Sequence, residues 1–333
     1  MRYRSERALV FILIAGFFAA SPPARADELF ASTDQGVGMY DANGNFIQNL
    51  ALPVSPTIGN GLGGFIDPTG IAIGSDGSVY VADYQANTGT NDGAIYHFSA
   101  AGNYLGAFAS DSSLYEPQGI AFGLNGDLYV TNYAANNSYI SAYDTSGNPV
   151  TLSGGTGGGP VGYFLGLSAP AGGITFGPNG DLYIPDPFNG VDQYAADGTY
   201  IRSFGFADPL DGPSGVAIDA SGNVFVTDAT NGNVVEFDSN GNYLATLDPS
   251  NPVLGGNGWA QPSALTFEPN GNLLISDDLG ITQYDFSSVT AFSDGGGDFL
   301  AYDATVPEPS MVLLCALAGL GLWMRRRYSA KTL

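Results

Sequence analysis

The residues Asn125-Gly126-Asp127-Leu128-Tyr129-Val130-Thr131-Asn132 are the clearest indication of the fold, because their pattern recurs through the chain. A tight turn with a glycine leads into an apolar strand, and the strand closes on a short polar residue. Four further copies follow this pattern: Asp76–Asp83, Asn179–Asp186, Ser221–Asp228 and Asn270–Asp277. The turn glycines are spaced by 49, 54, 42 and 49 residues. Self-similarity at such a period predicts a solenoid or a propeller.

Each copy contains four strand-like runs. The first resembles Gly119-Ile120-Ala121-Phe122, the second is the apolar strand described above, and the fourth follows another glycine turn, as in Gly241-Asn242-Tyr243-Leu244. The third run ends in an aromatic residue in every copy: Phe98, Tyr143, Tyr194, Phe237 and Tyr284. Asn-Gly, Asp-Gly and Ser-Gly pairs supply the positive φ angles of hairpin turns. Four antiparallel strands per repeat are typical of a propeller blade.

The first blade lacks its first strand at the N-terminal side. Leu29–Thr33 matches the second strand, Val37–Tyr40 the third, and Gly44–Ile47 the turn into the fourth. After the last full repeat, Leu300-Ala301-Tyr302 fits Ile120-Ala121-Phe122 position for position. The sequence therefore predicts an all-β fold: a six-bladed β-propeller with four-stranded blades over residues 27–304, closed by a C-terminal strand that completes blade one.

The motif Pro-x-Gly-(Ile/Val)-Ala followed by a glycine turn resembles the NHL repeat. It occurs as Pro68-Thr69-Gly70-Ile71-Ala72 and as Pro213-Ser214-Gly215-Val216-Ala217. Two features depart from that family's pattern. The basic residue usual before the third strand is missing, and Ala264 replaces the glycine in blade six. The resemblance implies an NHL-like propeller and leaves its function open.

Residues 1–26 are interpreted as a secretory signal peptide. Three arginines precede an apolar run from Ala8 to Ala20, and Ala24-Arg25-Ala26 forms an A-x-A cleavage site. A permanent N-terminal anchor is the alternative. We therefore expect an exported protein.

Residues 305–333 are interpreted as a second targeting segment, at the C-terminal side. Pro307-Glu308-Pro309 precedes an uncharged apolar run from Met311 to Met324, and Arg325, Arg326 and Arg327 follow it. That run spans about 21 Å as a helix, short of a hydrocarbon core of about 30 Å, so we expect a short transmembrane helix with its arginines in the cytoplasm.

The order of these three parts resembles the PEP-CTERM sorting signal of Gram-negative bacteria that build exopolysaccharide. The resemblance implies an exosortase-type processing enzyme as a partner. It also implies an inner-membrane intermediate, and then a place in the cell envelope, on the outer surface or in the extracellular matrix. An ordinary tail anchor is the alternative.

Charge excludes one class of function. The chain has nine lysines and arginines, but between residues 27 and 310 only Arg202 remains, against 31 acidic residues. Nucleic acids and anionic lipids need basic counter-charges, so binding of nucleic acid is excluded. The single cysteine, Cys315, allows no intrachain disulfide, and packing must hold the fold.

A polar residue closes the second strand of every blade. The set comprises Thr33 in blade one and then Asp83, Asn132, Asp186, Asp228 and Asp277. Such side chains around a channel mouth could bind a cation or a sugar, which makes the last five a candidate binding face. They could instead cap the following turn through backbone N–H groups, and their presence in every blade favours this structural interpretation.

Other chemistry is sparsely represented. His97 is the only histidine, which leaves little for a histidine metal site or a Ser-His-Asp triad, and we expect a solvated strand residue. The Gly-rich run Ser153–Gly173 lacks the Lys and Ser/Thr of a phosphate loop. We identify no catalytic residue and no required cofactor, the metal ligands stay unknown, and the acidic surface is expected to gather Ca²⁺ weakly.

Strand direction separates two faces of the propeller. The turns after first and third strands are short, as in Ser75-Asp76-Gly77, and define a tight-turn face. The opposite, long-loop face carries varied loops: Pro53–Asp67, Ser153–Gly173 and Asp248–Gln261. Varied loops on a rigid frame indicate recognition. We predict a non-catalytic binding or scaffold protein that binds a polysaccharide or protein on the long-loop face. The alternative is a metal-dependent lactonase- or lyase-like enzyme acting in a central acidic pocket.

Overall fold

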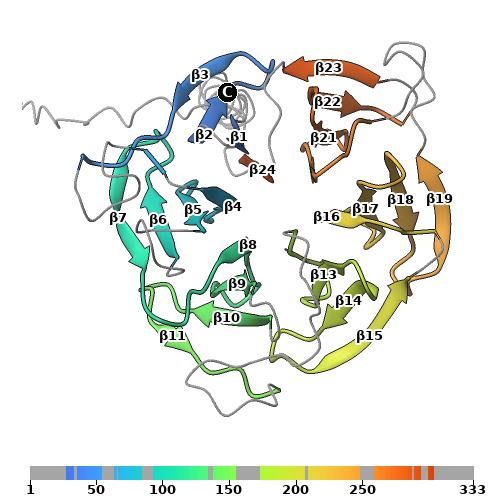
Figure 1. Ribbon diagram of the computed structural model, residues 1–333, viewed down its shortest axis with the longest axis horizontal. Coiled ribbons are helices and arrows are strands. Elements are labelled where there is room, and N and C mark those ends of the chain that lie inside the picture. The colour runs from blue at the N-terminus through green and yellow to red at the C-terminus, as the bar shows by residue number, and fades with distance from the viewer. Residues whose placement is uncertain are drawn as a thin grey trace, which may run out of the picture. The chain divides into compact units, whose positions relative to one another are not determined.

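The computed structural model describes residues 28–33, 36–54, 64–65, 67–84, 93–133, 138–154, 173–206, 209–247, 259–286, 289–293 and 299–303. These residues form six four-stranded antiparallel sheets arranged as the blades of a ring (Figure 1). The described residues contain no helix. The expected all-β, six-bladed propeller is therefore confirmed. The proposed signal peptide and sorting tail, and most of the three long loops, lie outside the described residues, so their interpretation stays a prediction.

Within each blade the strands run in order from the ring axis to the rim (Figure 1). Blade one has the order β24 (Phe299–Asp303), β1 (Glu28–Thr33), β2 (Gly36–Tyr40) and β3 (Phe46–Asn49). Blade two contains β4 (Pro68–Ile73), β5 (Val79–Asp83), β6 (Ala94–Phe98) and β7 (Tyr104–Ala109). Blade three contains β8 (Pro117–Phe122), β9 (Leu128–Asn132), β10 (Tyr139–Tyr143) and β11 (Pro149–Val150).

The remaining blades repeat this plan. Blade four contains β12 (Thr175–Phe176), β13 (Leu182–Asp186), β14 (Gly190–Tyr194) and β15 (Tyr200–Gly205). Blade five contains β16 (Pro213–Ile218), β17 (Val224–Asp228), β18 (Asn233–Phe237) and β19 (Tyr243–Leu247). Blade six contains β20 (Ala264–Phe267), β21 (Leu273–Asp277), β22 (Gly280–Tyr284) and β23 (Val289–Ser293). No helix among the described residues is long and apolar enough to cross a membrane.

The ring closes within blade one. Strand β24 pairs antiparallel with β1, so that Phe30 faces Ala301 and Ala31 faces Leu300. The innermost strand of blade one thus comes from the far end of the propeller segment, as the match of Leu300-Ala301-Tyr302 to Ile120-Ala121-Phe122 predicts.

The core consists of six apolar layers, one between each pair of neighbouring blades. Successive side chains of a strand point to opposite faces of its sheet. Phe30 of β1 therefore packs toward blade two, whereas Leu29 and Ala31 pack toward blade six. Most second strands are buried along their whole length, as β9, β13, β17 and β21 show. This burial explains why they are apolar at successive positions.

Glycine in the Pro-x-Gly motif lets neighbouring innermost strands approach closely. A Cβ atom on Gly70 of blade two would lie 2.5 Å from the carbonyl oxygen of Gln118 and 2.7 Å from the backbone nitrogen of Ile120, both in blade three. A Cβ atom on Gly215 would meet Ser263 of blade six at 2.7 Å. The motif is thus a packing requirement at the axis of the ring.

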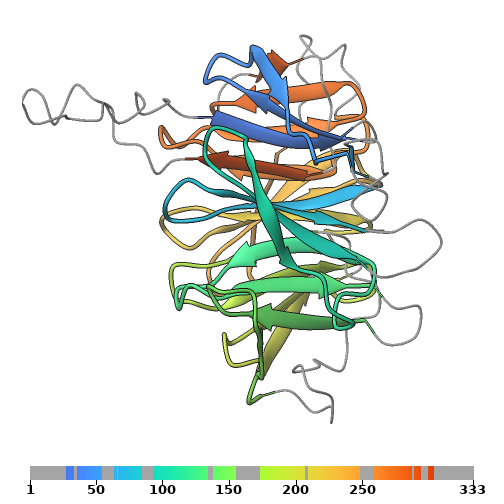
Figure 2. The ribbon, with the colours of Figure 1, turned by 90° about the vertical axis from the view of Figure 1, so that its left-hand side faces the viewer.

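The two faces of the ring differ as strand direction predicts. In the side view of Figure 2 the short hairpin turns gather on the left-hand face. These turns hold glycine at positive φ, for example Gly77 at 79° and Gly126 at 84°. Several of them also contain an aspartate whose carboxylate binds the turn: Asp41 Oδ1 accepts the backbone N–H groups of Asn43 and Asn45. The tight-turn face is therefore uniform for structural reasons.

Candidate functional site

The polar residues that close the second strands are buried. The side chains of Asp83, Asn132, Asp186 and Asp228 have no exposed surface, and Asp277 is 5% exposed. In four blades the side chain accepts a backbone N–H from the segment that enters the first strand of the same blade. The donors are Asp67 to Asp83, Tyr115 to Asn132, Asp211 and Gly212 to Asp228, and Ala260 to Asp277.

The following turn is bound in three blades. Phe188 donates its backbone N–H to Asp186 Oδ1, Asn231 donates to Asp228 Oδ1, and Leu279 donates to Asp277 Oδ1. The sequence anticipated this cap on the following turn, but not the bond to the incoming segment. These carboxylates and the Asn132 amide therefore bind the described backbone of the long-loop face to the ends of the second strands. The described residues do not test whether these side chains form a binding face, which stays a prediction.

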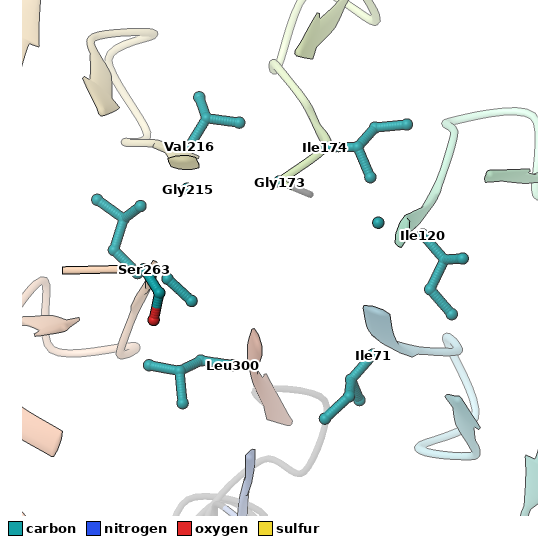
Figure 3. Close-up of a pocket in the computed structure, with 11 residues that line it drawn as sticks. Ile71, Ile120, Gly173, Ile174, Gly215, Val216, Ser263 and Leu300 are labelled. Carbon is teal, nitrogen blue, oxygen red and sulfur yellow. The ribbon is translucent and has the colours of Figure 1, made fainter. Parts of the chain in front are cut away.

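Two hollows lie on the ring axis. The smaller has a volume of about 50 Å³, and Figure 3 shows Ile71, Ile120, Ile174, Val216 and Leu300 around it. The larger, about 310 Å³, is lined by residues further along the innermost strands, toward the tight-turn face. Its lining includes six small residues, one per blade: Ala72, Ala121, Thr175, Ala217, Thr266 and Ala301. The larger hollow thus lies between the C-terminal halves of the innermost strands, on the tight-turn side of the channel.

Backbone groups also face this channel. Gly74 donates its N–H to the carbonyl of Ser78. Hydrogen-bonded and non-hydrogen-bonded residue pairs alternate along antiparallel strands. The backbone of Ala72 therefore bonds to that of Tyr80. The backbone N–H and C=O groups of Ile71 and Ile73 point the other way, toward the axis of the ring. The described lining contains no carboxylate and no other charged side chain. These two hollows therefore lack the carboxylates that the enzyme hypothesis places in a central pocket.

His97 is a strand residue, as expected, but it is only partly exposed to solvent. Its ring stacks on Tyr80 with centroids 4.4 Å apart and planes 14° from parallel, and Phe108 packs against the edge of the Tyr80 ring. Burial lowers the pKa of His97, although the charge of Asp76 opposes that shift. The Nε2 atom is buried without a hydrogen-bond partner among the described residues. Cross-strand pairing of His97 with Tyr80 explains this position, and it gives no reason for a catalytic role.

A polar cluster that the sequence did not single out lies on the long-loop face between blades two and three. Tyr84 follows Asp83, and its pKa is raised by burial and by a hydrogen bond to Glu116. Glu116 adopts φ of 47°, an uncommon value for a residue with a side chain. Tyr133, in the corresponding position of blade three, donates its backbone N–H to the carbonyl of Glu116. The only sequence signal was an aromatic residue after each strand-closing residue of these two blades.

Large apolar side chains are exposed on the described parts of the long-loop face. Phe188 and Leu279, in the β13–β14 and β21–β22 turns, are 60% and 76% exposed, and Phe206 follows β15. The exposed carboxylate-bearing residues Asp67, Asp211 and Asp278 lie on the same face. Among the described residues, no group of three or more histidine, cysteine, aspartate or glutamate side chains could hold a metal ion. The described parts of this face therefore present individual exposed apolar side chains together with carboxylates.

Comparison with known proteins is consistent with this architecture. Residues 210–237, which cover β16 to β18, match the family model of the NHL repeat. The described chain is an NHL-like β-propeller. No curated protein matches it. The NHL-like propeller is similar to a chain in the crystal structure of a nidogen/laminin complex, with a TM-score of 0.59 and 18% identity over 85% of this chain and 100% of that one.

Two further structures share the fold. A protein of unknown function from Bacteroides caccae has a TM-score of 0.60 and 13% identity, covering 83% of the NHL-like propeller chain and 98% of its own. Selenomethionine-substituted virginiamycin B lyase from Staphylococcus aureus has a TM-score of 0.50 and 21% identity, covering 74% and 73%. At these identities the likeness concerns the fold alone, because one fold hosts many functions.

Proposed function

We propose that this chain is an exported, exosortase-sorted, non-catalytic binding or scaffold protein of the cell envelope or exopolysaccharide matrix. Its propeller binds a polysaccharide or protein partner through the long-loop face. The supporting observation is the set of exposed apolar side chains there, led by Phe188 and Leu279. Exposed apolar side chains supply contact area for a partner, and the carboxylates that bind the incoming segments hold the backbone of this face on a rigid frame.

The export part of the proposal rests on sequence. The A-x-A site at Ala24 and Ala26 supports cleavage of a signal peptide, and Pro307-Glu308-Pro309 with Arg325–Arg327 supports sorting by an exosortase-type enzyme. Similarity to a lyase of the same fold does not favour an enzyme here. The described channel has aliphatic side chains and backbone groups where the enzyme hypothesis needs carboxylates.

Co-sedimentation of the purified protein with envelope and matrix fractions of the native host tests the binding face. Replacing Phe188→Ser together with Leu279→Ser should abolish retention by these fractions. The matched control is Leu124→Ser, because Leu124 lies in a turn of the tight-turn face and is 75% exposed, like Leu279 at 76%. Equal retention of the double variant and the wild type would exclude the long-loop face as the contact.

A further inference from the structure

Acidic residues are absent from the outermost strands of the propeller. The outermost strands are β3, β7, β11, β15, β19 and β23, and none of their residues is an aspartate or glutamate. This is unexpected in a segment with 31 acidic residues, because solvent-exposed strands are natural positions for charge. The negative charge therefore lies in turns, loops and inner strands, with Asp238 and Asp248 on either side of β19 in sequence, and the outermost strands themselves are neutral apart from Arg202 on β15.

Strand β19 is the least protected of these edges. It reads Tyr243-Leu244-Ala245-Thr246-Leu247, with neither a charged residue nor Gly or Pro. Tyr243, Leu244 and Thr246 are exposed. Its inner side pairs with β18, whereas its outer side faces away from the ring and pairs with no strand among those the structure describes (Figure 1). An exposed edge of this kind is a template for pairing with another strand.

The other rim strands differ from β19. Strand β7 has two register shifts against β6, one on either side of Gly106, whereas β19 has a single shift against β18, at Leu244. Strand β15 contains Arg202, and β3 and β11 have only four and two residues. Described residues of β23 include no exposed large apolar side chain. Charge, irregularity or shortness therefore limits pairing at most of these edges.

We propose that two copies of this chain associate through β19, which pairs with itself antiparallel across a two-fold axis and extends the blade-five sheets of both copies into one. A second copy is the partner that this edge fits. A basic partner would find no carboxylate on β19, and an acidic partner no cation. An antiparallel pair of identical strands is self-complementary, as a two-fold interface requires. This association is separate from the binding proposed for the long-loop face.

The net charge of the chain predicts how dimerisation depends on salt concentration. Each copy carries a formal charge of −23, so two copies repel one another at long range. Salt screens that repulsion, with a Debye length of about 10 Å at 0.1 M and about 3 Å at 1 M, but leaves neutral strand pairing intact. Dimerisation through β19 therefore strengthens as the salt concentration rises, whereas an interface held by ion pairs would weaken.

Sedimentation velocity of the full chain in mild detergent tests the proposal. We expect a dimer that is favoured by salt, and the substitution Leu244→Lys should raise its dissociation constant about tenfold or more by adding a charge to the edge. The control is Leu105→Lys on β7. It makes the same change at a residue of similar exposure, 58% against 48%, and should leave the dimer intact. If the chain dimerised through another surface, both variants would dimerise as the wild type does.

Hydrogen exchange at two protein concentrations gives a readout without a variant. The amides of Tyr243–Leu247 should be more protected at the higher concentration, because pairing engages their outward N–H groups. The proposal is overturned if the wild type is monomeric at every salt concentration, if Leu244→Lys dimerises as the wild type does, or if Leu105→Lys is equally disruptive. Exchange on β19 that does not depend on concentration would also overturn it.

Discussion

Ala31 and Leu300 face each other across β1 and β24, although nearly the whole propeller segment separates them in sequence. Both also lie in the apolar layer shared with Leu274 and Ile281 of blade six. One pairing thus completes blade one and packs it on blade six. Strand β24 joins the two ends of the ring, so the stability of every blade depends on its pairing with β1.

Removing the closing strand should therefore destabilise the whole ring. A chain ending at Gly297 lacks β24 and exposes the inner edge of β1. We expect its melting temperature to fall by about 10 °C, which for a domain of this size corresponds to several kcal/mol. A chain ending at Asp303 keeps β24 and is the control. Equal melting temperatures of the two truncated chains by circular dichroism would show that closure contributes little.

The close approach of blades two and three at the axis predicts a strong effect of one methyl group. Gly70→Ala places a Cβ atom against the backbone of Gln118 and Ile120, which cannot move independently of β8. We expect a loss of about 1–3 kcal/mol in the free energy of unfolding, as for other overpacked sites. Ala264→Gly makes the reverse change at the equivalent position of blade six and should cost less. Urea denaturation measures both, and a neutral Gly70→Ala would contradict the packing explanation.

The fold was predictable from sequence because the repeats carry local and long-range information together. Turn glycines, apolar second strands and the aromatic residue at each third-strand end, such as Tyr143 and Phe237, lie where the pattern places them. Even ring closure followed, because Leu300-Ala301-Tyr302 has the pattern of a first strand and no other segment supplies one.

The candidate site was less predictable, because it depends on how blades pack and not on what each contains. An aspartate at the end of a second strand has the same sequence context whether its carboxylate binds a ligand or accepts backbone N–H groups. Only the structure shows Asp228 accepting the N–H groups of Asp211 and Gly212. The central channel likewise follows from which backbone edges and side chains meet at the axis. The stacking of His97 on Tyr80 was not predicted, because it depends on strand register.

Acid should destabilise the protein through its tight turns. Hydrogen bonds from the side chains of Asn45, Asn148 and Asn242 lower the pKa of Asp41, Asp144 and Asp238 in the folded state. A carboxyl group whose pKa is lower in the folded state stabilises the fold above its unfolded pKa of about 4. This contribution is lost as the pH falls through the folded pKa. The melting temperature should therefore drop between about pH 4 and pH 2.

A variant pair isolates this effect. Asp238→Asn removes one titrating group and should make the drop in melting temperature smaller. Asp127→Asn is the control with the opposite sign, because burial raises the pKa of Asp127, and acid relieves the cost of its buried charge. Differential scanning fluorimetry from pH 2 to pH 7 measures both. An unchanged acid drop in Asp238→Asn would mean that this turn contributes nothing to the pH dependence.

Processing at the C-terminal side follows from the proposed sorting signal. Deleting Arg325–Arg327, or replacing Pro307-Glu308-Pro309 by alanines, should leave the precursor uncut in the native host. Lys331→Ala, a charge change outside the arginine cluster, should be processed normally. Intact-mass spectrometry of the extracted protein distinguishes the forms. A wild-type protein that still ends at Leu333 would identify the segment as an ordinary anchor.

Arg202 joins blade four to blade five. From β15 its guanidinium donates to the carbonyls of Ser239 and Asn240 in the turn between β18 and β19, and to Gln193 Oε1 within its own blade. The same group lies 5.4 Å from the centroid of the Phe204 ring. Gln48 of blade one has a simpler version of this contact, since its Nε2 donates to the carbonyl of Ala101 in blade two at 3.0 Å. The one cation between residues 27 and 310 thus has a structural role.

Replacing Arg202 should therefore loosen this pair of blades in proportion to the bonds lost. Arg202→Ala removes all three hydrogen-bonded contacts, and we expect a loss of about 1–3 kcal/mol in the free energy of unfolding. Arg202→Lys keeps the charge, but one ammonium cannot reproduce the planar fork that reaches both carbonyls and Gln193, so it should recover less than half of the loss. Gln48→Ala, which breaks a single neutral bond, should cost less than Arg202→Ala. Full recovery by lysine in urea denaturation would show that charge, and not the geometry of the guanidinium, holds the two blades together.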